Sequence, residues 1–575
     1  MGSLRIPMPE GLVTRLAETM TRSGIKRSIQ VPQGYTYIGQ MISHDIVPNT
    51  NLTPSRNPTR FLNLDSLYGQ PGDDLQDKLF DADGRFRLDA VPGAPGAADL
   101  HRPTGGIPQI PEQRNDENVI VRQLHVLWLQ LHNKIVTNHL GAQSREQRIR
   151  FAQAFVVMLF QAMVTRDLLH RLCQPRVYDL YVSQGKRFLY ANSHDFTKIP
   201  PVFSHAGFRF GHSMVRSRYN LQKDRASLPI EQLFLPATPL HKDHVIDWSL
   251  FFGDIPSGTL EAQAIDLDLA EGMGQVHFGN APGNIAKINI QASQALPSGP
   301  SILACIKAQH PILYDAFQIA THYPTGMSLL GTALSDFTDE VAVDDMPLWL
   351  YVLLEARSNV ETPFSRLGPV GSMIVLEVLS QAIDGAAITI SADETQQAAW
   401  LGPLLGLYQA TVATEDFGME TIINMVNHNS DDTGVSMSEL ASWVGKGITV
   451  GDSDIPDELE ALRNYHPLPD GTFRVETKIR EGGDSIQMSA SVPPWTSGAN
   501  NIMKSMKFKL KKADGVEYLE AKDSDVSLDG YRVHRWRIEK EMDVDGLTVF
   551  LDKIDWVNSE TGKGARTRWR WARIQ

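Results

Sequence analysis

The first residues with clear chemical potential are Gln40, His44 and Asp45, which fall in an apolar, helix-compatible stretch. On a helix, residues four apart share a face, so we expect Gln40 and His44 to project into one cavity. Asp45 lies about 100° further round the helix and must point elsewhere. One short helix can therefore serve two sites, a reaction pocket on one side and a cation on the other. The alternative is a histidine that only packs in a core.

The loop at 59–69 offers an oxygen atom at every second residue. These oxygens are the hydroxyl of Thr59, the backbone carbonyl of Phe61 and the side chains of Asn63 and Asp65. Oxygens that converge from a looped backbone are the ligands that Ca²⁺ takes in proteins. Asp45 would add a further oxygen and a second negative charge. The alternative is a polar turn that leads into a strand.

Arg114 stands just ahead of a strongly helical segment at 121–135. A side chain at such a helix start would be held rigidly, and its cation would suit a polarised oxygen or a carboxylate; a solvated loop arginine is the alternative. We expect Asp116 or Asn115 to provide the N-cap of this helix, because both residue types accept hydrogen bonds from the first free backbone N–H groups.

Arg209 and His212 are three residues apart, so both can face one large, planar, anionic ligand. The histidine would lie toward the centre of that ligand and the arginine toward its rim. Gly211, beside the histidine, would permit the close approach of a bulky group.

Composition excludes several classes of protein. The net charge of −13 argues against a dedicated nucleic-acid binder, which would usually be basic. The two cysteines, Cys173 and Cys305, fit neither a disulfide framework nor a metal-ligand spacing. The first residues lack the apolar core of a signal peptide, and no uninterrupted apolar run is long enough for a transmembrane segment. We expect a cytoplasmic protein, with signal-independent secretion as the alternative.

Two domains are expected from the change of pattern along the chain. Helical periodicity dominates to about residue 445, whereas apolar and polar residues alternate after about Asp470, which favours an antiparallel sheet with one buried face. We predict a mostly helical domain at 1–467 and a β-sandwich or barrel-like domain at 468–575. The pattern Arg-Trp-Arg-Trp at 568–571 suits a surface that binds another protein or a glycan; the alternative is an edge strand with core tryptophans.

Taken together, the ordered motifs resemble the animal-type haem peroxidases, the peroxidase–cyclooxygenase superfamily with its bacterial members. The segments that carry the resemblance are Gln40–Asp45, Thr59–Gly69, Arg114–Glu117 with Leu124–Asn133 behind it, Phe208–His212 and Ile288–Gln291, with Leu367–Gly371 as a further echo. The resemblance implies a mainly α haem-peroxidase domain, to which this chain adds the C-terminal antiparallel β domain.

The resemblance also implies a role for each residue around the haem. His44 matches the distal acid/base, Gln40 the distal glutamine that holds water or halide, and Arg114 the distal arginine. His212 matches the proximal ligand of the haem iron. The resemblance further implies that Asn289 accepts a hydrogen bond from the other ring nitrogen of His212, and that Arg209 pairs with a haem propionate.

The same resemblance assigns a calcium shell to Asp45, Thr59, Phe61 (through its carbonyl), Asn63 and Asp65. The cofactors implied are haem b and one calcium ion. Glu117 matches a position that forms an ester with the haem in some members. Ser43 stands where those members have a second ester-forming aspartate, and so cannot form that link.

The implied activity is that of a haem peroxidase, which reduces H₂O₂ and oxidises a small donor through an oxyferryl intermediate, and which would act in the response to oxidative stress. With fewer haem links, bromide, iodide or organic donors are favoured over chloride. The alternatives are a haem-dependent dioxygenase acting on a lipid or another dedicated substrate, and a non-catalytic haem scaffold that presents the β domain. Cyclooxygenases carry a radical-forming tyrosine three residues before the proximal histidine, where this chain has Arg209.

Overall fold

The chain divides into two compact units, Met1–Gly445 and Lys446–Gln575. The computed structural model describes residues 7–22, 27–48, 59–70, 76–190, 196–253, 255, 258–278, 281–318, 346–359, 362–386, 401–413, 417–427 and the strands that lie between 474 and 573. The domain boundary expected at 467/468 and the pattern at 568–571 lie outside the described residues.

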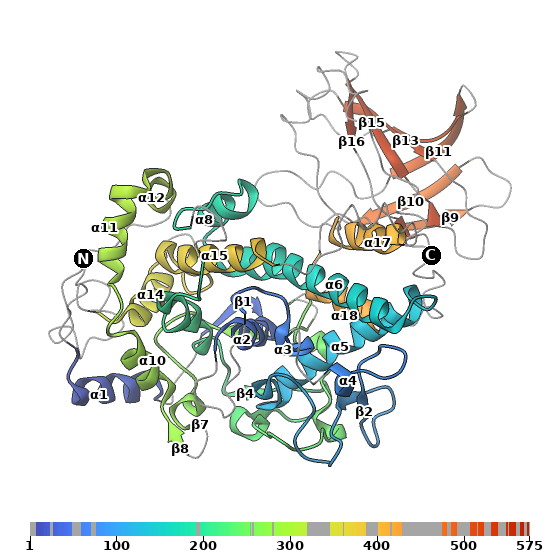
Figure 1. Cartoon of the computed structure of the whole chain (residues 1–575). Helices are drawn as coiled ribbons and strands as arrows, with labels where there is room; N and C mark the ends of the chain where they lie inside the picture. The colour runs from blue at the N-terminus through green and yellow to red at the C-terminus, as the bar shows by residue number, and fades with distance from the viewer. Residues whose placement is uncertain are drawn as a thin grey trace. The chain divides into compact units, whose positions relative to one another are not determined.

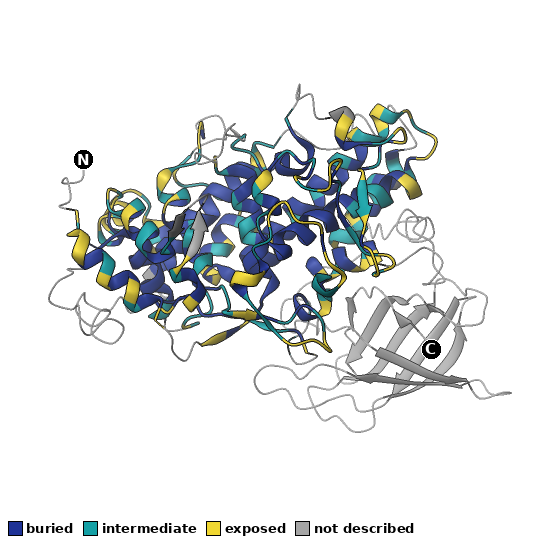
Figure 2. Ribbon diagram, turned by 90° about the horizontal axis from the view of Figure 1, so that it is seen from below, coloured by how far each residue is buried: buried dark blue, intermediate teal, exposed yellow. Residues whose placement is uncertain are grey.

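The first unit is built on helices that are buried around most of their circumference (Figures 1 and 2). Every residue of α5 (Val119–His139) from Val119 to Leu129 is buried, and so is every residue of α14 (Leu348–Arg357) up to Ala356. The same holds for α15 (Pro369–Asp384) up to Ala382, which begins with a proline at its first turn. Helices that are apolar all round form the interior of a large domain. The expected mainly helical domain is confirmed.

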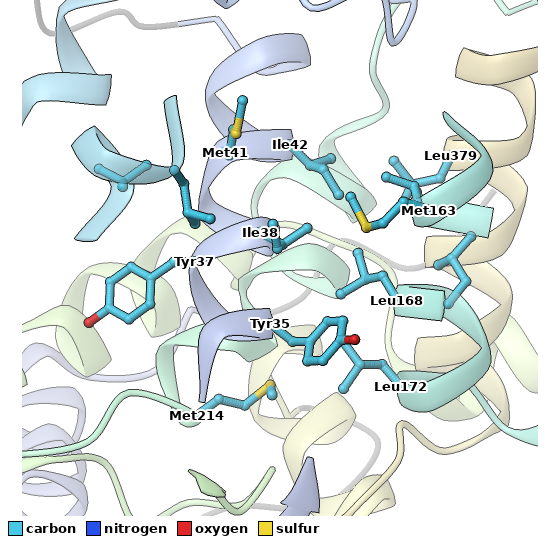
Figure 3. Packing of buried hydrophobic residues seen from close by; sticks show 14 of the residues in the cluster. Tyr35, Tyr37, Ile38, Met41, Ile42, Met163, Leu168, Leu172, Met214 and Leu379 are labelled. Carbon is cyan, nitrogen blue, oxygen red and sulfur yellow. The ribbon is translucent and has the colours of Figure 1, made fainter. Parts of the chain in front are cut away.

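Helix α2 (Gly34–Ile46) carries Gln40, His44 and Asp45 and lies inside the first unit. Figure 3 shows its core face, where Ile38 and Ile42 point toward Met163, Leu168 and Leu379 of other helices. Burial of such side chains contributes about 1.5–3 kcal/mol each, which fixes the rotation of the helix. A Cβ at Gly34 would come within 2.4 Å of the Phe252 ring, so only glycine fits where the helix begins.

A short two-stranded sheet positions the start of α2. Strand β1 (Ser28–Pro32) pairs antiparallel with β6 (Glu261–Gln263), and the backbone N–H of Gln263 donates to the carbonyl of Met214. Met214 follows the 3₁₀-helix η4 (Gly207–His212), which carries Arg209 and His212. The Thr36 hydroxyl donates to the same carbonyl at 3.4 Å. The sheet therefore brings the helix of His44 and the turn of His212 to one region.

The N-cap of helix α5 lies two to three residues after the caps expected from the sequence. Its N-cap is Asn118, whose side-chain oxygen accepts the backbone N–H groups of Ile120 and Val121 at 2.9 and 3.0 Å. The expected caps, Asn115 and Asp116, lie instead in the 3₁₀-helix η1 (Gln113–Asp116). The expectation was wrong because η1 forms a turn of its own, after which the chain is extended at Asn118.

Asp116 belongs to a buried network of charges beneath η1. Its Oδ1 lies 2.5 Å from Nη2 of Arg102 and 2.7 Å from Nε of Arg122, and its Oδ2 accepts the backbone N–H of Ala237. Asp99 pairs with Arg102 at 3.2 Å, so two carboxylates balance two guanidinium groups. Removing one partner of a buried pair costs about 3–5 kcal/mol, because the other charge is left uncompensated. The network therefore holds η1 firmly from below.

One helical run, Arg145–Leu172, is long and apolar enough to cross a membrane by length and composition. It comprises α6 (Arg145–Met163), the π-helical turn η2 (Val164–Leu168) and α7 (Leu169–Leu172). Of its most apolar window, 72% is buried inside the protein, which is the behaviour of a core helix.

In the second unit, the described strands form an antiparallel meander in the order β16-β15-β13-β12-β11-β10-β9. Neighbours in the sequence pair with each other, as in Leu510 opposite Leu519 and Trp536 opposite Ile554. The strands are β9 (Arg474–Ile479), β10 (Ser485–Ser491), β11 (Met506–Ala513), β12 (Val516–Lys522), β13 (Tyr531–Ile538), β15 (Leu551–Asn558) and β16 (Gly564–Thr567), with β14 (Thr548–Val549) paired to β17 (Ala572–Arg573). That this unit folds as a separate β domain stays a prediction.

Candidate functional site

A hydrogen-bonded row of three side chains begins at His44. Its Nδ1 lies 2.8 Å from Oδ1 of Asn115, and Nδ2 of Asn115 lies 2.9 Å from Nδ1 of His125. His44 is only 6% exposed, and Asn115 and His125 are fully buried. Burial lowers the pKa of His125 to about 3, so this ring is neutral at physiological pH. The arrangement fixes the ring plane of His44, which an acid/base group requires.

Arg114 is held against the same histidine. Its Nη2 donates to the carbonyls of His44 and Val47 at 3.1 and 2.9 Å, at the C-terminal end of α2. Its Nε and Nη2 also donate to the two carboxylate oxygens of Glu112 at 3.0 Å. Burial raises the pKa of Glu112, but the hydrogen bond and charge of Arg114 outweigh it and lower that pKa overall. The rigid arginine expected at this helix start is therefore present, next to His44.

Gln40 and Glu117 complete this side of the site. The Nδ2 of Asn118 donates to Oε1 of Gln40 at 3.3 Å, which connects α2 to the N-cap of α5. Burial raises the pKa of Glu117 to about 7; the charge of Arg114 opposes this shift and that of Glu112 adds to it. Glu117 is thus largely a neutral acid below pH 7, which suits a group destined for an ester more than a solvated ion.

The second histidine, His212, lies on η4 and contacts Asn289 of α10 (Ile285–Ser293). The ring Nδ1 is 2.7 Å from Nδ2 of Asn289, while Oδ1 of Asn289 accepts from Nη1 of Arg209 at 2.9 Å. Arg209 also donates through Nε to the carbonyl of Ser204 at 2.8 Å. Burial, and then the charge of Arg209, lower the pKa of His212 to about 3, so the ring is the neutral form that binds a metal.

The direction of this contact differs from the one that the resemblance implies. Asn289 is expected to accept from His212, yet its carbonyl oxygen is on Arg209 and its amide nitrogen faces the ring. Arg209 itself is expected on a propionate. Both differences meet at the Asn289 amide: its oxygen accepts from Arg209, so its nitrogen is the atom presented to the His212 ring.

Open space adjoins the turn of His212 and the helix of Gln40 and His44. A Cβ at Gly211, beside His212, or at Gly39, beside Gln40, would meet no atom within 4 Å. A large planar anion needs this room, together with a neutral histidine as iron ligand, a cation at its rim and an acid/base on the other face. The residues present therefore fit a haem.

The expected cation loop is folded around Asp45. Oδ2 of Asp65 accepts from the Thr59 hydroxyl at 2.6 Å, and the same hydroxyl is 3.4 Å from the Phe61 carbonyl. Asp45, fully buried, accepts the backbone N–H groups of Leu64 and Ser66 at 3.0 and 2.8 Å. The structure thus brings Thr59, the Phe61 carbonyl and Asp65 together and ties their loop to Asp45 of α2.

Two observations favour a hard cation there. Oδ1 of Asn63 is buried and has no hydrogen-bond partner among the described residues, an expensive state for a carbonyl oxygen. Leu64 has a φ of 56°, a left-handed conformation that a leucine rarely adopts and that is common at ligand sites. The loop offers two carboxylates, those of Asp45 and Asp65. Accordingly, no group of three or more His, Cys, Asp or Glu side chains that could hold a metal occurs in the described part of the chain. The remaining ligands would be neutral oxygens, which calcium accepts.

Three comparisons with known proteins bear on this site. The model of the family described as animal haem peroxidase matches residues 28–291. No curated protein matches the sequence. Among solved structures, the chain is similar to a fatty acid alpha-dioxygenase of Oryza sativa, with 11% identity and a TM-score of 0.50 over 74% of this chain and 81% of that one. It is also similar to peroxidase A of Dictyostelium discoideum, with 16% identity and a TM-score of 0.46 over 68% and 85%. At these identities the solved structures indicate the fold alone.

Proposed function

The chain belongs, through residues 28–291, to the animal haem peroxidase family, and on this premise we propose that it is a haem-dependent peroxidase that reduces H₂O₂ and oxidises a small donor. One observation carries the proposal: His44 and Arg114 are fixed to each other, the histidine through Asn115 at 2.8 Å and the arginine through the His44 carbonyl at 3.1 Å. A base and a cation held together in this way suit the cleavage of a peroxide.

The residues divide the work as follows. Haem, when bound, supplies the iron that accepts the peroxide and the redox equivalents for donor oxidation. His212 would hold the iron. His44 takes the proton from one oxygen of H₂O₂ and delivers it to the other, so that water leaves. Arg114 stabilises the negative charge that develops on the departing oxygen.

Arg209 is the residue that we expect to bind a haem propionate. A haem propionate is a stronger acceptor than a neutral amide, because hydrogen bonds between two charged groups are the strongest class. We propose that Arg209 would hold a haem propionate in place of the Asn289 amide. The amide of Asn289 can then turn, so that its oxygen accepts from Nδ1 of His212. That hydrogen bond orients the ring and increases its basicity as a ligand.

Bromide, iodide and organic molecules are the donors we favour. Ser43 cannot form an ester, which leaves Glu117 as the single position for a covalent haem link. A lipid dioxygenase is the alternative, and the fold is compatible with it. Arg209, three residues before His212, is engaged with Asn289 and Ser204 and cannot supply the tyrosyl radical of a cyclooxygenase-type reaction.

The decisive experiment uses haem-loaded full-length protein with H₂O₂ and a panel of bromide, iodide, phenols and fatty acids. We expect H₂O₂ to change the haem spectrum and donors to be oxidised, and we expect His44→Ala to slow the spectral change by about 10²–10⁴-fold with haem still bound. Oxidation of a fatty acid with O₂ alone would instead support the dioxygenase. If the protein consumes neither H₂O₂ nor any donor, the peroxidase assignment is wrong.

We also propose that calcium occupies the loop of Asp45, Asn63 and Asp65 and thereby anchors the helix of His44, and that residues 468–575 fold as a separate β domain. The second proposal is supported by the sequential pairing of its strands. Limited proteolysis of the full chain tests it, since a folded domain should survive as a stable C-terminal fragment of roughly that length, and its complete degradation would contradict the proposal.

A further inference from the structure

The row His44–Asn115–His125 ends at Nε2 of His125. His125 is neutral and uses Nδ1 toward Asn115, while its Nε2 is buried without a hydrogen-bond partner among the described residues. A neutral imidazole carries one N–H and one lone pair, so what Nε2 must find depends on how the row is oriented.

Two orientations of the Asn115 amide are chemically consistent. In the observed one, Nδ1–H of His44 donates to Oδ1, and Nδ2 of Asn115 donates to Nδ1 of His125. His44 then carries its lone pair on Nε2, and His125 carries a hydrogen on Nε2. If the amide turned round, every donor and acceptor would exchange, and Nε2 of neutral His44 would hold a hydrogen. Only the first orientation leaves Nε2 of His44 able to take a proton.

A small enclosed cavity of about 10 Å³ adjoins His125 and is also lined by Gln109, His101 and Arg87. This volume is about what one water molecule needs, and the lining offers the polar partners that such a water requires. His101 and Arg87 also line an open surface groove of about 680 Å³. His101 is oriented there by a hydrogen bond from Nδ1 to Asp89 at 2.8 Å. The far end of the row therefore lies next to a polar cavity close to the surface.

We propose that Asn115 and His125 are positioning residues that hold His44 as the Nδ1–H tautomer, and that a water molecule in this cavity accepts the Nε2–H of His125 and so fixes the direction of the row. The tautomer of His44 is thus set at His125, which acts on His44 through the side chain of Asn115. This inference rests on the proposed function only in the meaning it gives to Nε2 of His44; the tautomer itself exists without haem.

A double-mutant cycle on haem-loaded protein tests the proposal through cyanide binding instead of turnover. Cyanide arrives as HCN and binds ferric haem as the anion, so its association needs a base that takes the proton. Asn115→Leu, which keeps the size and removes both hydrogen bonds, should slow association about 10–100-fold, a part of the 10²–10⁴ that acid–base groups supply. His125→Phe should slow it about 10-fold, because the amide is then free to turn round.

The Asn115→Asp background supplies the discriminating arm. A carboxylate presents an acceptor to His44 whichever way it turns, so adding His125→Phe in that background should change the association rate by less than about 2-fold. If His125 only packs, His125→Phe should slow cyanide association equally with Asn115 and with Asn115→Asp, because a loss of packing does not depend on the direction of a hydrogen bond. Equal slowing, or no effect of Asn115→Leu in folded protein, would overturn the proposal; unchanged denaturant midpoints show that the variants are folded.

A haem-free measurement separates this inference from the proposed function. In protein labelled with ¹⁵N-histidine, the ring nitrogens of His44 should show hydrogen on Nδ1 and a lone pair on Nε2, and His125→Phe should mix the two tautomers. The opposite tautomer in unmodified protein would refute the inference even if peroxidase activity is found. If the protein never takes up haem, the peroxidase proposal fails and the tautomer result still stands.

Discussion

Glu117 allows a quantitative test, because its buried carboxyl links stability, pH and the haem ester. Burial raises its pKa from 4.5 to about 7 in the folded protein. Above pH 4.5 the unfolded chain releases this proton while the folded protein retains it, so the unfolded state binds fewer protons and stability falls as pH rises. At about 1.4 kcal/mol per pH unit, the loss between pH 4.5 and 7 is about 3 kcal/mol.

Glu117→Gln keeps the size of the side chain and removes the titration. In haem-free protein we expect the variant and the unmodified protein to unfold at similar urea concentrations at pH 4.5. At pH 8 the variant should be more stable by up to about 3 kcal/mol. Urea midpoints followed by tryptophan fluorescence at several pH values measure the difference. A pH-independent difference would refute the idea that this carboxyl is held neutral by burial.

Glu355 is the matched control. Its pKa is also raised to about 7 by burial, but its carboxylate accepts the backbone N–H groups of Val370 and Gly371 at the start of α15. If Glu117 forms an ester in haem-loaded protein, it no longer titrates. Its contribution to the pH dependence of the unfolding free energy should then vanish, while that of Glu355 persists. If haem extracts freely into acidic organic solvent and the term of Glu117 is unchanged, there is no ester.

Three further predictions concern the supports of the site. Asn118→Ala should destabilise the protein by about 0.5–2 kcal/mol through the lost helix cap, and Asn118→Asp, which keeps the cap, should recover most of it in urea unfolding; equal losses would argue against capping. Chelation of calcium should lower the thermal unfolding temperature and release haem, whereas Asp45→Asn protein should already be destabilised and respond little to the chelator; identical responses would exclude Asp45 as a ligand. Asn289→Asp presents a carboxylate that can accept from both Arg209 and His212, so the midpoint potential of the haem iron should fall by about 60 mV for each tenfold stabilisation of the ferric form, and an unchanged potential would remove Asn289 from the support of the ligand.

Residues that act through their type and spacing could be predicted from the sequence. The pairing of His212 with Asn289, which are far apart in the chain, is instead what the family resemblance implies, and the two side chains are in contact at 2.7 Å. The loop of Thr59 and Asp65 could be predicted because alternate oxygens are visible in the sequence itself. The direction of the Asn289 hydrogen bond could not, because it depends on which partner Arg209 finds in three dimensions.

The row behind His44 was missed for a different reason. Asn115 suits a helix cap and His125 fits the apolar rhythm of a core helix, so each residue had a sufficient local explanation. The available signal was a conflict: His125 and His132 are polar side chains on a face that is otherwise buried, and buried polar groups need partners. His132 finds its partners in Tyr68 and the Gly84 carbonyl, and His125 finds one in Asn115. The partner of His125 becomes known only from the path of η1, which places Asn115 between His44 and His125.

The charges beneath η1 have a consequence for how this enzyme can change. Arg102, Arg122 and Asp116 hold the turn from below, whereas Arg114 and Glu117 project from the same turn toward the site. The turn is also capped from within, because the Glu112 side chain accepts the backbone N–H of Arg114 at 3.0 Å. Because Arg114 and Asp116 lie two residues apart in this short turn, a substitution that disturbs the buried charges should also displace Arg114, so we expect the framework and the chemistry to change together.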